Sequence, residues 1–239
     1  SYVKALTELT LDAKAVRSIG FPLSAALVER ELRIAQGTVV GCNHALEHGI
    51  AFNIAGGTHH AFSDRGEAFC LLNDQAIAAQ YLINQKKCHK ILIVDLDVHQ
   101  GNGTAEIFQN NADVITFSMH GQSNYPFRKE TSDYDIALPD KTDDTTYLSI
   151  LQETLPELLN IHRPDFVFYL AGVDILGTDK LGKLGCTLEG CKTRDSYVLG
   201  LCKSLGIPVQ VSMGGGYSPA IKTIIEAHAN TYRVARALY

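Results

Sequence analysis

The chain has 239 residues, of which 46% are hydrophobic and 20% are charged, so it is long enough to bury the core of one α/β domain. The formal net charge is −5 and no run of Lys or Arg stands out, which argues against nucleic acid or an anionic membrane as a direct partner. No apolar stretch approaches the roughly 20 residues that a membrane-spanning helix needs.

Six cysteines are scattered along the chain without a CxxC pair, a distribution unlike that of a disulfide framework or a zinc finger. Reduced thiols are therefore expected. The first residues, SYVKALTELTLDAK, resemble neither a signal peptide nor a transit peptide. Together these features predict a cytoplasmic protein.

Short apolar runs alternate with helical patterns along the chain, an order that predicts a three-layer α/β domain with a mainly parallel central sheet. The predicted strands are 50–54, 91–97, 114–118, 135–138, 166–170 and 208–212. The predicted helices are one that follows Pro22, then 71–85, 148–159 (ended by Pro164), 189–205 and 219–238. No repeat or linker interrupts this pattern, so residues 1–239 are expected to form a single domain.

Polar residues gather where the predicted strands end, which is where parallel α/β folds bind ligands. Five strand ends carry them: His59 with His60, Asp95 with Asp97 and His99, His120, Asp174, and Tyr217. Each motif alone has an ordinary structural explanation, such as a loop, a helix cap or, for 101–103, a turn. Their coincidence at five strand ends indicates an active site.

The stretch DLDVHQGNG at 95–103 predicts a metal ion. In an extended chain Asp95, Asp97 and His99 share one face. Two carboxylates and an imidazole are costly to desolvate together unless a cation lies among them. With Asp174, the residues Asp97 and His99 offer three ligands and leave an open position, the pattern of catalytic zinc. A histidine pair to move protons and a tyrosine to donate to an oxyanion complete a metal-assisted amide or ester hydrolase.

Five motifs resemble those of the zinc-dependent histone deacetylase family, most closely its class IV members and their bacterial relatives. They are GGTHHA at 56–61, DRGEAFC at 64–70, DLDVHQGNG at 95–103, GVD at 172–174 and GGGY at 214–217. Their order and spacing fit over nearly the whole chain. The resemblance implies the arginase/deacetylase fold, with a parallel sheet of about eight strands between helices.

The resemblance also implies two metal sites. Zinc, with ferrous iron as an alternative, would be bound by Asp97, His99 and Asp174. A structural potassium ion would be bound by a second set: Asp95, the Ser118 hydroxyl and the backbone oxygens of Asp97, His99 and Met119.

The resemblance assigns the catalytic roles as well. His60 would be the general base and then the general acid, and Asn102 would orient it. His59, paired with Asp95, would act as its more electrostatic neighbour. Tyr217 would polarise the acyl carbonyl.

A tunnel for an acyl-lysine chain is implied in the same way, with Phe69 on one wall and Tyr125 or Phe127 on the other. Leu181 matches a position on its rim. The substrate-binding residues expected from the resemblance are Gly57, Phe69, Tyr125, Phe127, Leu181 and Gly215. Ala68 stands where the family usually has Gly, which would alter how the backbone meets the substrate amide.

Other departures from the family pattern bear on activity. Asn102 stands where some classes carry Asp, so His60 would be a weaker base, and Gln100 replaces a second His. The family has a strand and a rim loop ahead of the point where this chain starts, and both are expected to be absent here.

The expected function is that of a zinc-dependent amidohydrolase that removes acetyl or longer acyl groups from lysine side chains of peptides or proteins, or from related amines. The alternatives are an acetylpolyamine or other small-amide deacetylase and a non-enzymatic acyl-lysine reader or scaffold. A haloacid-dehalogenase-like phosphohydrolase fits poorly, because it explains neither His99 nor the histidine pair. An arginase-like site with two manganese ions fits poorly, because Gln100 and Asn102 stand where further ligands are needed.

Overall fold

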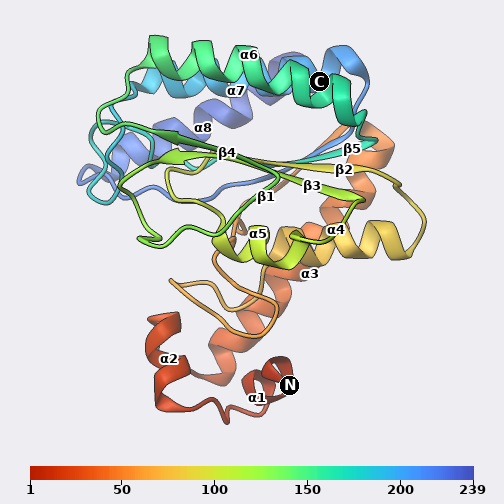
Figure 1. Ribbon diagram of the computed structural model, residues 1–239, viewed down its shortest axis with the longest axis vertical. Helices are drawn as coiled ribbons and strands as arrows, with labels where there is room; N and C mark the ends of the chain where they lie inside the picture. The colour runs from red at the N-terminus through yellow and green to blue at the C-terminus, as the bar shows by residue number, and fades with distance from the viewer.

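One parallel sheet of six strands lies between two layers of helices in the computed structural model, which describes all 239 residues (Figure 1). The strand order is β1-β6-β5-β2-β3-β4. The strands are β1 (Ile50–Asn53), β2 (Ile91–Asp95), β3 (Val114–Gly121), β4 (Tyr134–Leu138), β5 (Phe166–Leu170) and β6 (Val209–Ser212). Each corresponds to a predicted strand, and the predicted three-layer α/β architecture is confirmed.

Helices cover both faces of the sheet. They are α1 (Tyr2–Thr7), α2 (Ala13–Ile19), α3 (Ala25–His48), α4 (Asp74–Asn84), α5 (Asn102–Phe108), α6 (Asp144–His162), α7 (Leu188–Leu205) and α8 (Ile221–Leu238). Figure 1 shows α6, α7 and α8 over one face and α3, α4 and α5 over the other, with α1 and α2 at the far end of α3. The sequence does not predict α1, α2 or α5, because segments of six or seven residues are too short to show a helical pattern.

Residues 101–103, whose composition on its own is a turn signal, are instead the beginning of α5. Gly103 packs so closely on the loop after β1 that a Cβ atom there would lie 2.2 Å from the backbone oxygen of Ala61. Packing of the helix against this loop overrides the local turn signal of Gly101-Asn-Gly103.

Local signals explain where the longer helices begin and end. Ser24 caps α3 by accepting a hydrogen bond from Leu27 N at 3.2 Å, and Gly49 ends that helix with a φ of 87°. Helix α6 ends at His162 and is followed by Arg163 with a φ of 46°, because Pro164 disfavours right-handed helical backbone in the residue before it.

The three central strands, β2, β3 and β5, are buried along their whole length. Leu92 and Val94 belong to the hydrophobic core beneath α6, α7 and α8, whereas Ile91 and Ile93 belong to the core on the side of α3 and α4. Strands covered on both faces need apolar residues at successive positions, which is the pattern the sequence shows.

The register of the sheet brings several strand ends to one edge. Asp95 at the end of β2 lies opposite Ser118 of β3 on one side and Leu170 of β5 on the other. Strand β6 ends at Ser212, also opposite Leu170. The loops that follow these strands therefore meet, and they carry the predicted site.

The sheet is smaller than the resemblance implies. Strands β1 and β4 form its edges, and the residues ahead of α3 form α1 and α2 rather than a further strand. The expectation of about eight strands is therefore wrong for this chain.

All six cysteines are buried and free. Burial raises the pKa of a thiol such as Cys202 to about 12, so it is protonated at neutral pH. None of the helices combines the length and the apolarity that crossing a membrane requires.

Candidate active site

Asp97, His99 and Asp174 form a buried cluster beyond the carboxyl ends of β2 and β5. Their ligand atoms all lie within 4.8 Å of one another. His99 Nδ1 is 2.9 Å from Asp97 Oδ1 and 3.3 Å from Asp174 Oδ2. The Oδ2 atom of Asp174 is nonetheless buried without a hydrogen-bond partner. An unpaired buried carboxylate oxygen is costly, so the arrangement fits a bound cation.

The charges of the cluster also favour a cation at its centre. Burial and the neighbouring Asp97 raise the pKa of Asp174 to about 7. Burial opposes a charge on His99, but Asp174 and Asp97 outweigh it and raise the pKa of His99 to about 10. Two carboxylates thus compete for one positive charge, and a divalent ion supplies that charge without a proton. Zinc and ferrous iron both accept two carboxylates and an imidazole as ligands.

The backbone that brings these side chains together is not the extended strand that was predicted. Strand β2 ends at Asp95, and residues 97–99 form a bend instead of continuing the strand. Asp97 N donates to Asp95 Oδ1 at 3.1 Å, and His99 N donates to Asp97 Oδ1 at 3.0 Å. The carboxylates therefore hold the bend. The predicted extended ladder is wrong, although its three side chains still share one site.

Glycines beside the cluster let the backbone approach the ligands. Gly215 N donates to Asp97 Oδ2 at 2.9 Å, and a Cβ atom on Gly215 would lie 2.1 Å from Asp174 Oδ2. Gly57 N donates to Asp74 Oδ1 at 2.9 Å. Neither glycine is among the residues that line the cavity, and their expected contact with substrate stays a prediction.

His59 and His60 lie beside the cluster, with ring centroids 4.1 Å apart. His59 Nδ1 lies 2.7 Å from Asp95 Oδ2, and His60 Nδ1 lies 2.7 Å from Asn102 Oδ1. Burial opposes a charge on His59, but Asp95 outweighs it and raises the pKa of His59 to about 9. Burial and the neighbouring His59 lower the pKa of His60 well below its ordinary value. At neutral pH one ring is therefore charged and the other is neutral.

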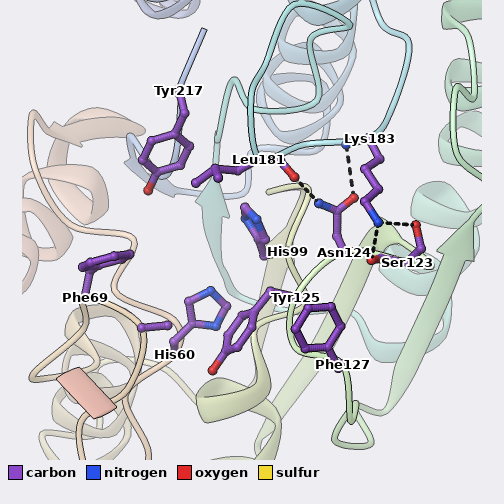
Figure 2. A pocket seen from close by; sticks show the side chains of 11 residues that line it. His60, Phe69, His99, Ser123, Asn124, Tyr125, Phe127, Leu181, Lys183 and Tyr217 are labelled. Carbon is purple, nitrogen blue, oxygen red and sulfur yellow. Dashed lines mark hydrogen bonds between the residues drawn. The ribbon is translucent and has the colours of Figure 1, made fainter. Parts of the chain in front are cut away.

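A cavity of about 390 Å³ opens over His60 and His99. Figure 2 shows Phe69 on one side and Tyr125 and Phe127 on the other, with the two histidines between them. The residues that line it are His60, Ala68, Phe69, His99, Ser123, Asn124, Tyr125, Phe127, Leu181, Lys183 and Tyr217. The expected tunnel aromatics and Leu181 thus share one cavity with the histidines.

Three polar residues of this cavity are not predicted from the sequence. Asn124 Nδ2 donates to the backbone oxygen of Leu181 at 2.7 Å, and Lys183 N donates to Asn124 Oδ1 at 3.2 Å. Lys183 Nζ donates to Ser123 Oγ at 3.2 Å. These contacts join the loop after β3 to the loop after β5. Because the two loops are far apart along the chain, no local pattern indicates them.

Tyr217 lies across the cavity from His60 and Tyr125 (Figure 2). Its backbone N donates to Asp179 Oδ2 at 2.6 Å, which holds the loop after β6 in place. The side chain is 41% exposed, and its hydroxyl makes no hydrogen bond within the protein. The hydroxyl is therefore free to contact a ligand in the cavity.

The residues expected to hold potassium lie together, but the ion itself stays a prediction. Asp95 and Ser118 are neighbours in the sheet and line one small cavity, and Met119 is buried beside them. Ser118 Oγ lies 3.0 Å from His120 Nδ1, and burial lowers the pKa of His120 to about 4.

A parallel α/β fold with this ligand cluster and histidine pair at its strand ends is typical of metal-dependent hydrolases. The family model for the histone deacetylase domain matches residues 1–232. The chain belongs to the histone deacetylase family, as the motifs predicted.

Similar proteins support this assignment. The chain is 48% identical over 238 residues to an uncharacterized protein of Picosynechococcus sp., a match that covers 100% of this chain and 79% of that protein. It is 31% identical to histone deacetylase 2 of Arabidopsis thaliana and 33% identical to histone deacetylase RPD3 of Saccharomyces cerevisiae, over 79% and 71% of this chain. These matches span 50% and 40% of the two deacetylases, half of their length or less.

Among solved structures, that of acetylpolyamine aminohydrolase from Burkholderia pseudomallei aligns with a TM-score of 0.75 and 25% sequence identity. The alignment covers 91% of this chain and 65% of the other. This similarity confirms the predicted arginase/deacetylase fold, and together with the family it supports a hydrolase of the deacetylase class.

Proposed function

We propose that the chain is a zinc-dependent deacetylase that hydrolyses the amide bond between an acyl group and a lysine side chain or related amine. The observation that carries this proposal is the buried cluster of Asp97, His99 and Asp174 beside an apolar-walled cavity, with a charged and a neutral histidine next to it. Membership in the histone deacetylase family supports the reaction class.

His60 and Tyr217 face the cavity in which the amide would bind. With its Nδ1 atom directed at Asn102, His60 can take a proton from water through Nε2 and return it to the leaving amine. The Tyr217 hydroxyl donates to the acyl oxygen as negative charge develops there. A divalent ion held by the buried cluster would polarise the acyl carbonyl and acidify water.

His59 contributes a fixed charge and not a proton. Asp95 keeps its ring positive, so negative charge that develops in the site meets a cation already in place. The same positive ring lowers the pKa of His60 and keeps that base neutral. The two histidines therefore support one reaction in different ways.

The cavity walls suit an extended acylated amine. Phe69 and Leu181 are each about half exposed, at 50% and 49%, and Phe127 is 90% exposed. The methylene groups of an acyl-lysine chain would cover this apolar surface, and burying apolar area contributes about 25 cal/mol per Å². An acylated lysine of a peptide or protein is therefore the favoured substrate.

An acylated small amine is the second candidate, because the acetylpolyamine aminohydrolase of B. pseudomallei shares the fold over 91% of this chain. A non-catalytic reader is disfavoured, since the ligand cluster, both histidines and Tyr217 are all in place. We place the reaction in the cytoplasm, where the six buried cysteines would stay reduced.

The test is hydrolysis of acetyl-lysine peptides, long-acyl-lysine peptides and acetylated polyamines by the zinc-loaded protein. Asp174→Ala removes one ligand carboxylate and is expected to abolish both zinc binding and turnover. Asp113→Ala is the matched control, because Asp113 is exposed just ahead of β3, at the opposite end of the sheet.

Turnover that survives in Asp174→Ala would contradict the proposal. Turnover of one substrate class alone would decide between lysine and polyamine. Zinc and peptide binding without turnover would favour the reader.

A further inference from the structure

A chain of hydrogen bonds continues from His60 and Asn102 away from the metal cluster and reaches Glu67. Asn102 Nδ2 donates to Glu67 Oε1 at 3.1 Å, and the Tyr125 hydroxyl donates to the same oxygen. Arg65 Nε lies 3.6 Å from the other carboxylate oxygen, Oε2. Glu67 does not line the cavity, so it can influence the site only through other side chains.

The carboxylate of Glu67 decides which way the Asn102 amide points. The two ends of an amide have nearly the same shape, but only the NH₂ end can donate and only the oxygen can accept. The Glu67 oxygen already accepts from the Tyr125 hydroxyl, and the other oxygen of the carboxylate faces Arg65, so the group acts as an acceptor toward Asn102 as well. The NH₂ group of Asn102 must therefore face Glu67, and its oxygen must face His60.

This orientation determines the tautomer of His60. Asn102 Oδ1 lies 2.7 Å from His60 Nδ1, and an amide oxygen has no proton to donate, so Nδ1 must carry the hydrogen. In the neutral ring Nε2 is then unprotonated, and it is the atom that the proposed mechanism uses. With the amide reversed, Nε2 would carry the hydrogen and could not accept another.

A tight hairpin holds Glu67 in place. Glu67 and Cys70 exchange two backbone hydrogen bonds of 2.9 Å, and the residues between them, Ala68 and Phe69, have φ values of 44° and 68°. Positive φ at both central residues is the type I′ turn geometry. The N–H groups of these two residues donate to the last carbonyls of α2, at 3.0 and 2.7 Å. The hairpin thus places Phe69 in the cavity wall and directs Glu67 toward Asn102.

We propose that Glu67 is a positioning residue that fixes the amide orientation of Asn102 and, through it, the Nδ1–H tautomer of His60. The inference rests on the proposed function only for its effect on turnover. It also accounts for the combination of an amide at position 102 with an acid at position 67, because a carboxylate at 102 would face that of Glu67.

The direct test is the tautomer of His60, measured from the nitrogen chemical shifts of the ¹⁵N-histidine-labelled full chain, with and without zinc. The His60 resonances are assigned by their loss in His60→Ala. The wild type and Glu67→Gln, which keeps an acceptor oxygen, are expected to show the Nδ1–H form. Glu67→Ala is expected to show a mixture with the Nε2–H form. An unchanged tautomer in Glu67→Ala would overturn the proposal.

Glu106→Ala is the matched control. Glu106 accepts from Ser63 N at 3.1 Å and from Ser63 Oγ at 2.8 Å, so its carboxylate holds the loop between His60 and Glu67 but makes no side-chain hydrogen bond with Asn102. The wild-type tautomer is expected in this variant. A changed His60 tautomer in Glu106→Ala would mean that loosening the loop between His60 and Glu67 is enough to change it. That result would overturn the specific role of Glu67.

The effects of Glu67→Ala on kcat and on KM distinguish a positioning role of Glu67 from a role in substrate binding. Glu67→Ala is expected to lower kcat about tenfold or more, the loss of a properly oriented base, and to leave KM nearly unchanged. A raised KM with unchanged kcat would contradict the proposal. If the zinc-loaded wild type hydrolyses no substrate, the proposed function fails, and the tautomer measurement still decides the role of Glu67.

A double-mutant cycle tests the contact independently. Asn102→Asp is expected to lower the thermal unfolding midpoint, because the new carboxylate faces that of Glu67. In the Glu67→Gln background the same change is expected to lower the midpoint less, since the repulsion is gone. Shifts that simply add would overturn the proposed contact.

Discussion

Two neighbouring regions of the site, one around His59 and one around His60, use the same residue type to opposite effect. The two side chains are equally buried, at 5% and 6% exposed, and each ring has one partner at 2.7 Å. Burial lowers the pKa of both rings, but the Asp95 carboxylate raises that of His59 to about 9, whereas the Asn102 amide leaves that of His60 well below its ordinary value. The charge of the partner, and not the degree of burial, therefore decides the protonation state.

Removing each ring in turn should separate the two roles. His60→Ala is expected to lower kcat by about 10²–10⁴-fold, the range for a lost general acid–base group, while zinc stays bound. His59→Ala is expected to lower kcat less, because the site loses a fixed charge but keeps its base. Measurement of kcat and bound zinc in both variants checks this expectation. Equal losses in kcat in the two variants would contradict the different roles proposed for His59 and His60.

Replacing Asp95 by Asn should give His59 an uncharged amide partner, as His60 already has. The pKa of His59 is raised in the folded state, so the stability that it contributes is fully present below about pH 6.5 and is lost as pH rises through about 9. Asp95→Asn is therefore expected to lower the free energy of unfolding of the metal-free protein most near pH 6, by about 1–3 kcal/mol.

Burial also raises the pKa of Asp95, so the pair stabilises the fold by less than the shift of His59 alone implies. Urea unfolding of the wild type and of Asp95→Asn at pH values near 6 and above 9 measures the difference. A stability difference that does not shrink with rising pH would show that Asp95 acts on the fold by other means.

The smallest expected effect concerns the hairpin that supports the His60 region. Ala68 has a φ of 44°, a left-handed conformation that costs an L-residue roughly 1–2 kcal/mol and costs glycine little. The greater flexibility of glycine in the unfolded chain offsets part of this gain. Ala68→Gly is therefore expected to raise the free energy of unfolding by at most about 1 kcal/mol, or the thermal midpoint by about 2–4 °C.

Thermal melting checks this expectation, with Ala26→Gly as a control of opposite sign. Ala26 is exposed within α3, where glycine is expected to lower the free energy of unfolding by up to about 1 kcal/mol. A lower midpoint for Ala68→Gly would mean that the hairpin is not strained at this position.

The central strands could be predicted because both faces of the sheet are covered. In β2 successive residues from Ile91 to Val94 alternate between the two hydrophobic cores, so every position is apolar and the run itself marks the strand. Helix α5 could not be predicted in this way, because 101–103 has the composition of a turn. Its helical form depends on the close packing of Gly103 on Ala61, which comes from a distant segment.

The site could be predicted in part. Charged residues directly after apolar strands identify Asp97, His99 and Asp174 as a ligand set, and the structure brings them together. Glu67 could not be predicted, because one acidic residue in a loop is ordinary. Its partner Asn102 belongs to α5, and its other partner belongs to the loop after β3.

The sequence by itself determined the parallel α/β architecture, the family and the identity of the residues at the strand ends, because apolar runs and charged motifs are local features of the chain. Only the tertiary structure decided that β2 stops at Asp95, that Gly215 supports a ligand carboxylate, and that Glu67 reaches Asn102. The first two depend on backbone N–H groups that donate to a carboxylate and the third on a hydrogen bond between two side chains, and the last two join segments far apart in the sequence. Such contacts form only when the strand ends meet at one edge of the sheet.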